Sequence, residues 1–347
     1  MVVRWLPLLK DRGNKTLGTK AGAAVNIEDM FSTYVYTGNS ATQNIVNGID
    51  LATDGGMVWI KQRNGVYKNL ITDTVRGGST QLVTNTTAIS DGYTNITFNS
   101  NGMSLANNPE VNSLNNTFAS WTFKKQPRFF DMVKYNGNLS TSRTLSHNLG
   151  VTPGLIITKN ISNTDPWNVY HRSTGNTKTL YLNATTAATT DPDAWNNTSP
   201  TDTQFTIGEN VNQTGEYIAY IFAHDPLGAS GDGSDGMIAC GSVTTIDSDN
   251  DAKVTLGWEP QYILAKLKTA GQWFLVDCMR GIVVDGIDAS LYPSGNSAEN
   301  AFGALNMFEL TADGFYITKE ATQSQFGGSA EVVYMAIRRG MSVCSGA

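Results

Sequence analysis

The chain has 347 residues, of which 24 are Lys or Arg and 30 are Asp or Glu, so its formal net charge is −6. This acidic balance excludes an ordinary nucleic-acid binder, which needs a basic surface to neutralise phosphates. Charged residues make up only 16% of the chain, and Thr, Asn and Gly supply much of its polarity. Thr favours strands, while Asn and Gly favour turns. The composition is typical of an all-β protein.

Residues 1–30 stand outside the pattern that organises the rest of the chain, and we expect them to form a docking arm. Trp5, Leu6, Leu8 and Leu9 are apolar, but a proline among them and the Gly- and Lys-rich stretch that follows argue against a self-contained helix. An apolar segment of this kind needs to be covered. We therefore expect the arm to bind a neighbouring subunit or another protein of the same assembly; the alternative is an edge strand against the first domain.

The rest of the chain repeats one pattern of strands three times. Each copy opens with a strand that ends in a turn, continues with an apolar strand that carries a Lys near its end, and closes with an alternating strand. These lysines are Lys61, Lys159 and Lys266, and their spacing is that of one small domain. Short alternating strands separated by turn residues predict antiparallel β-sandwiches, each of which buries its apolar face between two sheets. The three tandem domains are expected at residues 31–128, 129–227 and 237–340.

A third strand lies between the apolar strand and the closing strand in each copy. Two of these third strands carry an Asp–Arg pair, Asp73 with Arg76 and Asp277 with Arg280, whereas the second copy has His171 at this place. Residues three apart in a strand point to opposite faces, so the two side chains of a pair need not be in contact. We favour a turn-fixing Asp with an outward Arg over a catalytic carboxylate. The third strands are expected at residues 71–77, 167–172 and 275–281.

Several phrases in these copies resemble a domain that is repeated in structural proteins of marine and cyanobacterial tailed phages. The resemblance spans residues 29–340, and its phrases are 29–39, 47–51, 55–61, 73–77, 146–150 and 336–339. It implies lectin-like jelly-roll domains in a virion protein, carried on the tail as a fibre or tail-associated component that contributes to host attachment. The main alternative is a capsid decoration or head-fibre protein, and a weaker one is a carbohydrate-active tail enzyme.

The resemblance also implies partners. Other virion proteins of the tail or head are expected to bind the N-terminal arm, and a host surface glycan is a candidate receptor. Symmetric oligomers are the rule for such components, and on family grounds we expect a homotrimer. Three widely spaced cysteines fit reduced thiols and assembly in the host cytoplasm. No run reaches membrane-spanning length, so no membrane insertion is expected.

Two tryptophans are candidates for binding the glycan. Trp195 lies in a polar Asp- and Asn-rich loop, and Trp167 follows another. An exposed ring beside amides and carboxylates is the usual chemistry of a sugar platform, because the ring stacks on the sugar while the polar groups hold its hydroxyls. The alternative, which is at least as common, is a ring that folds back over the end of the sandwich.

Metal sites and catalytic sites have weaker support. Asp247, Asp249 and Asp251 have the spacing of the first half of a calcium loop, but the second half is missing, so a solvated acidic hairpin is the better interpretation. Three histidines, His147, His171 and His224, have no metal-ligand spacing. No nucleophile elbow or phosphate loop is present in the sequence. We therefore predict a protein that is not an enzyme, with no cofactor and no catalytic residue.

Overall fold

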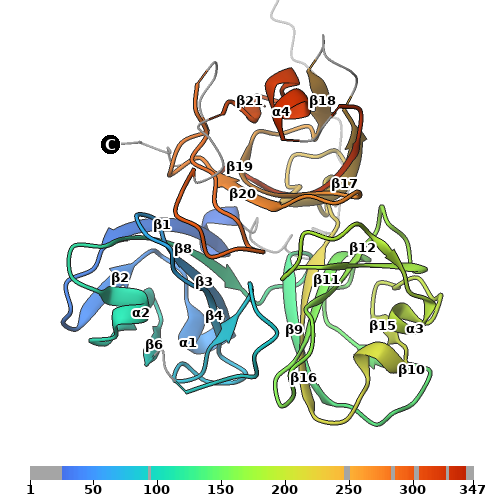
Figure 1. The fold of residues 1–347 in the computed structure, drawn as a ribbon, viewed down its shortest axis with the longest axis horizontal. Coiled ribbons are helices and arrows are strands. Elements are labelled where there is room, and N and C mark those ends of the chain that lie inside the picture. Colours follow the sequence, from blue (N-terminus) through green and yellow to red (C-terminus); the bar gives the residue numbers. More distant parts are fainter. Residues whose placement is uncertain are drawn as a thin grey trace, which may run out of the picture.

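The computed structural model describes residues 26–92, 95–245, 251–282, 286–300, 305–325 and 328–340. These residues form six antiparallel sheets joined by turns and a few short helices (Figure 1). The predicted all-β fold is therefore confirmed. Within the described residues, none of the helices has the length and apolar character that a membrane span requires.

One order of strands is found in each of three large sheets. The first strand of a unit lies at one side, the closing strand pairs with it, and the second and third strands follow: β1-β8-β3-β4-β5, β9-β16-β11-β12-β13-β14 and β17-β23-β19-β20. The first unit contains β1 (Phe31–Thr37), β3 (Gly56–Gln62), β4 (Asn69–Asp73), β5 (Leu82–Val83) and β8 (Thr117–Lys124). The second contains β9 (Phe130–Asn136), β11 (Pro153–Asn160), β12 (Asn168–His171), β13 (Lys178–Tyr181), β14 (Thr189–Thr190) and β16 (Glu216–Ala223). The third contains β17 (Ile238–Thr244), β19 (Pro260–Leu267), β20 (Trp273–Asp277) and β23 (Glu331–Arg338).

A small sheet covers the outer face of each large sheet and makes each unit a sandwich. In the first unit, Ile45 and Met103 of the small sheet belong to one buried cluster with Val58 and Ile60 of the large sheet. The small sheets are β2 (Gln43–Val46), β7 (Gly102–Leu105) and β6 (Ile96–Asn99); β10 (Arg143–Ser146) and β15 (Gln204–Ile207); and β18 (Ala252–Thr255), β22 (Gly314–Ile317) and β21 (Phe308–Thr311).

The helices are short and lie in the connections. Side-chain caps fix several of them: Asp50 accepts a hydrogen bond from the Thr53 amide at the start of α1, and Thr318 accepts one from the Ala321 amide at the start of α4. The α-helices are α1 (Leu51–Asp54), α2 (Pro109–Asn112), α3 (Pro192–Trp195) and α4 (Lys319–Ser324), and the 3-10 helices are η1 (Ile27–Asp29) and η2 (Glu209–Val211).

Strand register defines which residues are equivalent in the three units. The second and closing strands pair Trp59 with Trp121 in the first unit, Ile157 with Tyr220 in the second, and Leu264 with Met335 in the third. Asp73, His171 and Asp277 of the third strands are equivalent on the same criterion. Each pairs with the second-strand residue two places before Trp59, Ile157 and Leu264, respectively.

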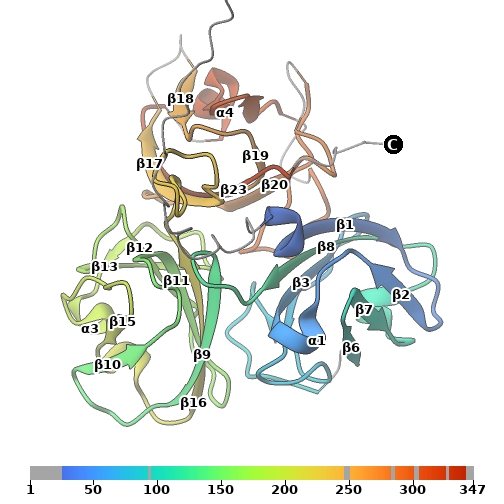
Figure 2. The same ribbon diagram turned by 180° about the vertical axis from the view of Figure 1, so that it is seen from behind.

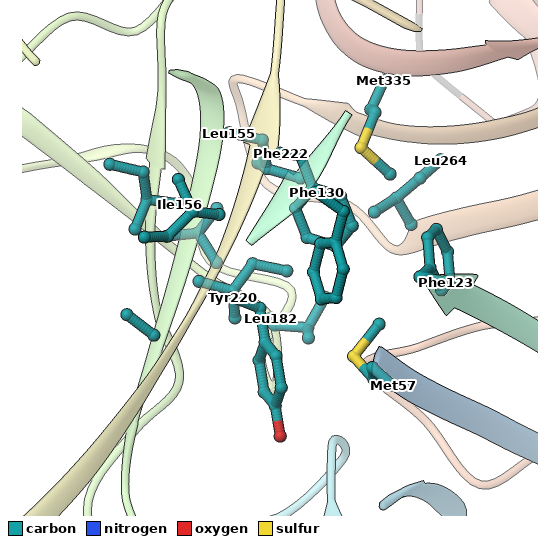
Figure 3. Packing of buried hydrophobic residues seen from close by; sticks show 14 of the residues in the cluster. Met57, Phe123, Phe130, Leu155, Ile156, Leu182, Tyr220, Phe222, Leu264 and Met335 are labelled. Carbon is teal, nitrogen blue, oxygen red and sulfur yellow. The ribbon is translucent and has the colours of Figure 1, made fainter. Parts of the chain in front are cut away.

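The inner faces of the large sheets meet at a common centre. The three units surround this centre with their large sheets inward and their small sheets and short helices outward (Figures 1 and 2). One apolar cluster includes Met57 and Phe123 of the first unit, Phe130 of the second, and Leu264 and Met335 of the third (Figure 3). Both faces of a large sheet are therefore covered, which explains why every residue of β3 and β11 is buried. Because the units share this centre, the limits predicted for three separate domains stay a prediction.

Candidate functional site

The polar residues that the sequence singles out come together where one unit meets the next. We call these contacts the 1–2, 2–3 and 3–1 junctions, after the units that they join. The third strand of each unit, with the turn after it, reaches the closing strand of the next unit at each junction. The equivalent residues Asp73, His171 and Asp277 lie at these contacts, and all three are buried.

The Asp–Arg pairs are closed ion pairs within the turn. The Nε of Arg76 lies 2.6 Å from the Asp73 carboxylate, and the Nε of Arg280 lies 2.6 Å from the Asp277 carboxylate. Each Asp also accepts the backbone N–H of its Arg, at 2.9 and 3.0 Å, so the expected turn-fixing role is observed. The expectation of an outward Arg is wrong, because each Arg follows the end of its strand and strand alternation no longer applies; the two guanidinium side chains are 2% and 0% exposed.

The 1–2 junction joins this ion pair to a tyrosine of the second unit. The Tyr220 hydroxyl donates to the Asp73 carboxylate at 2.8 Å and accepts from Nη2 of Arg76 at 3.3 Å. Burial raises the pKa of Tyr220 well above its usual range, so the hydroxyl keeps its proton. The contact therefore gives the Tyr220 hydroxyl two partners in the ion pair without adding a charge.

The 3–1 junction has the same arrangement of an Asp–Arg pair and a donor from the closing strand, with two further charged residues. The indole Nε1 of Trp121, which is equivalent to Tyr220, donates to the Asp277 carboxylate at 2.9 Å. The Arg280 guanidinium lies 5.3 Å from the centroid of the Trp121 ring, a cation–π distance. It also binds Glu299 at 3.0 Å, and Glu299 binds Arg63 of the first unit at 2.8 Å. This junction is therefore held by a network of four charges, in which Asp277 and Arg280 are buried and Glu299 and Arg63 are partly exposed.

The 2–3 junction differs because a histidine replaces the aspartate. His171 Nε2 lies 3.0 Å from the carbonyl oxygen of Tyr334, the residue before Met335 on the closing strand of the third unit. Thr174 stands where the other units have Arg76 and Arg280. The first unit thus contacts the second, the second the third, and the third the first, which closes a ring.

A second set of hydrogen bonds runs around the ring in the opposite direction. The residue four places before Asp73, His171 and Asp277 donates its side-chain N–H to the backbone of the preceding unit. Asn69 binds the carbonyls of Tyr292 and Gly295 at 3.1 and 2.7 Å, Trp167 those of Val83 and Thr86 at 3.1 Å each, and Trp273 that of Tyr181 at 2.8 Å.

Trp167 and Trp195 are buried, so the prediction of an exposed sugar platform at these residues is wrong. Trp167 is 0% and Trp195 1% exposed. Trp167 lies at the start of the third strand and reaches into the first unit, as described above. Trp195 ends α3, which turns its ring inward against Tyr170, at 5.7 Å between ring centroids. The polar neighbours of the two tryptophans in the sequence are turn and cap residues.

The predicted metal residues stay a prediction, because the structure describes only one of the three. Asp247 and Asp249 lie outside the described residues. Asp251 is exposed and accepts a hydrogen bond at 2.7 Å from the Lys319 amide at the start of α4. The described residues contain no group of three or more His, Cys, Asp or Glu side chains that could hold a metal ion. Residues 1–25 of the predicted N-terminal arm, with Trp5, Leu6, Leu8 and Leu9, also lie outside the described residues, so the docking role stays a prediction. Residues 26–30 are described, and Ile27 and Met30 are buried in the central apolar cluster.

One of the two cysteines in the described residues is not the reduced thiol that the sequence predicts. Cys240 is free and completely buried, and burial raises the pKa of its thiol, so it is an unreactive thiol in the closed ring. Cys278 is disulfide-bonded. The prediction of reduced thiols is therefore wrong for Cys278.

The three lysines that mark the second strands are buried and bound to backbone carbonyls. Lys61, Lys159 and Lys266 are at most 1% exposed, and burial lowers the pKa of each to about 8. Each ammonium group donates to the carbonyl of the next residue and to a carbonyl of the turn that follows. These acceptors are Gln62 and Gly65 at 2.6 and 3.3 Å, Asn160 and Asn163 at 2.6 and 3.4 Å, and Leu267 and Thr269 at 3.1 and 3.2 Å.

These lysines predict a pH dependence of stability. Because the pKa of Lys266 is about 8 in the folded chain and 10.5 ordinarily, the unfolded chain binds more protons between these values, and the free energy of unfolding rises with pH there. Lys266→Met should remove up to about 1.4 kcal/mol per pH unit of that rise, measured by urea unfolding at pH 8 to 9.5. Lys253→Met, at an exposed pair, should leave the rise in place. Equal slopes in the Lys266 variant and the wild type would contradict the assignment.

Comparison with known proteins places this ring in a family. A model for a domain of unknown function, DUF7483, matches residues 27–339. The chain belongs to the DUF7483 family. The DUF7483 match begins at η1 and ends after β23, so it covers all three units as one domain. A search of curated proteins finds no match to the chain.

Proposed function

We propose that this DUF7483 chain is a structural protein of a tailed-phage virion, carried on the tail as a fibre or tail-associated component that contributes to host attachment. The resemblance to repeated domains of phage structural proteins suggests the setting. The observation that carries the proposal is that buried polar groups join the units to one another. Each Asp–Arg pair and each indole or amide donor described above joins one unit to another, and this use suits a rigid building block of a particle.

The proposed partners follow from the same setting. Other virion proteins would bind the N-terminal arm, and the chain would assemble as a homo-oligomer, with a trimer as the proposed form. Attachment to a host glycan would need a surface other than Trp167 and Trp195, since both side chains are buried.

Immunogold labelling of intact particles tests the proposal. A purified antibody against the chain, with gold-conjugated secondary antibody, would be applied to negatively stained particles of the phage that encodes it, with secondary antibody alone as the control. We expect gold at the tail. Gold over the head would overturn the tail placement in favour of a decoration or head-fibre protein, and unlabelled particles that lack the chain by mass spectrometry would overturn the virion proposal itself.

A further inference from the structure

The 2–3 junction contains two histidines, whereas the other two junctions contain carboxylates at the equivalent place. His171 lies on β12 of the second unit, and His224 follows β16 of the same unit. His171 contacts β23 of the third unit through Tyr334, and His224 contacts β17 through the backbone of Cys240. Both histidines therefore lie between the second and third units.

The hydrogen bonds fix both histidines in their neutral form. Nδ1 of His171 accepts the backbone N–H of Ser173 at 3.1 Å, and Nδ1 of His224 accepts that of Cys240 at 3.1 Å. A nitrogen that accepts an N–H carries no proton, so the proton of His171 is on Nε2, which donates to the Tyr334 carbonyl. Protonation of Nδ1 would place two donors face to face and break the bond to the backbone at each histidine.

The surrounding charges are mostly positive. Arg172 follows His171 in the chain and donates to the Cys240 carbonyl at 3.4 Å. Lys268, just after β19, donates to the Ser173 carbonyl at 3.3 Å and binds Glu331 at 2.7 Å. The titratable and charged groups around the two histidines are Arg172 just after β12, Lys178 on β13, Cys240 on β17, Lys268 after β19, and Glu331 and Tyr334 on β23. Because Glu331 is already paired with Lys268, an imidazolium here would face cations without a free counter-charge among these groups.

We propose that the 2–3 junction is an acid-sensitive latch, which loosens when His171 and His224 take up protons while the 1–2 and 3–1 junctions stay closed. Asp73 and Asp277 hold the other two junctions as carboxylates paired with arginines. The equivalent place in these two junctions holds an aspartate and no imidazole. The ring would therefore open at one defined place, between its second and third units.

The direction and range of the pH effect follow from burial. Burial lowers the pKa of His171 to about 4, and burial together with the charge of Arg172 lowers that of His224 to about 4. Both pKa values rise toward 6.5 when the junction opens and the rings meet water. The closed form is therefore unaffected above pH 6.5, loses stability as the pH falls to 4, and has lost all of this contribution below 4. Between pH 7.5 and 5, His171 alone should shift the equilibrium toward opening about thirtyfold, and the partly exposed His224 less.

Cys240 is a built-in reporter of this opening. Its thiol is completely buried, and its backbone N–H and C=O bind His224 and Arg172. The rate at which 4,4′-dithiodipyridine labels Cys240 would be measured in the full chain from pH 7.5 to 5, with the site identified by mass spectrometry. Each rate would be divided by that of glutathione at the same pH, which removes the pH dependence of the thiol chemistry. We expect the normalised rate to rise at least about tenfold, with an unchanged far-UV circular dichroism spectrum.

Two variants separate the latch from a general effect of acid. In H171N/H224N, an amide oxygen can take the place of each Nδ1 without titrating, and the rise should be lost. In H147N, the matched control, the replaced histidine makes the same kind of bond, from the Leu149 amide at 3.3 Å, but both of its ring nitrogens bind residues of the second unit, so the rise should remain. A flat rate in the wild type, an equal rise in H171N/H224N, or a rise that coincides with loss of the circular dichroism signal would overturn the proposal.

Nuclear magnetic resonance gives a second test that keeps the proposal falsifiable if the double variant does not fold. The chain has three histidines, whose ring nitrogens can be followed in the wild type by long-range ¹H–¹⁵N correlation. We expect His171 to stay neutral, with Nε2 protonated, down to pH 5 in the closed form. An ordinary titration of His171 near pH 6.5 with no change in the signals of the 2–3 junction would overturn the latch.

Discussion

Asp277→Asn is expected to lower the free energy of unfolding by about 3–5 kcal/mol. The carboxylate is completely buried and is bound by Arg280 and by the Trp121 indole of another unit. The amide has nearly the same shape but no charge, so among the described residues the buried Arg280 guanidinium keeps Glu299 alone as an anionic partner. Removing one partner of a buried pair is costly because the other charge stays desolvated. Urea unfolding followed by tryptophan fluorescence and circular dichroism measures the loss.

Asp313→Asn is the matched control for this prediction. Asp313 forms an ion pair of similar length, 2.9 Å with Lys253, but both side chains are largely exposed. Such pairs contribute about 0–1 kcal/mol. If the two variants lose similar amounts of stability, the 3–1 junction does not hold the ring together in the way that its geometry indicates.

The succession of strands along the chain could be predicted because local signals in the sequence mark the strands. Each second strand carries a Lys at its end, and in the second and third units a Pro at its start, where the structure has a register shift between Pro153 and Leu155 and between Pro260 and Tyr262. Turn glycines follow the third strands, at positive φ in Gly77, Gly175 and Gly281. These features act within a few residues of one another, and their threefold repetition makes them visible in one sequence.

The closure of the ring could not be predicted, because its contacts join residues far apart in the chain. Tyr220 and Asp73 are 147 positions apart, and Trp121 and Asp277 are 156 apart. The apolar second strands did contain a hint: Met57 to Ile60 is a continuous apolar run, which favours burial on both faces of a sheet. Nothing in such a run says what covers the second face.

The sequence does contain a signal that predicts the burial of Trp167. Trp167 and Trp273 stand at the same place relative to their turns, four residues before His171 and Asp277. Trp273 lies in an apolar strand, which favours a buried ring, whereas the polar residues before Trp167 favour a surface loop. Equivalence in the repeat predicts the environment better here than local polarity, since both rings are at most 1% exposed and bind the preceding unit.

Trp167→Ala is expected to lower the free energy of unfolding by about 3–5 kcal/mol. The ring is completely buried, lies 6.5 Å from the Tyr220 ring, nearly parallel to it, and donates to two carbonyls of the first unit. Its truncation leaves a cavity beside the 1–2 junction and removes the donor that Val83 and Thr86 share. The loss is measured by urea unfolding at pH 7.5, above the range in which the histidines titrate. A stable variant with reduced binding to host cells would instead favour the exposed platform that the burial contradicts.

A comparison of two Trp→Phe variants separates the hydrogen bonds from the volume. Both rings are buried, but in the described part of the chain Nε1 of Trp195 has no hydrogen-bond partner, whereas Nε1 of Trp167 has two. Phenylalanine removes similar volume at both places and removes hydrogen bonds only at Trp167. Trp167→Phe should therefore cost about 1–3 kcal/mol more than Trp195→Phe. Equal losses would mean that the Trp167 indole holds the first and second units together by packing alone. Its hydrogen bonds to Val83 and Thr86 would then add nothing to the stability of the ring.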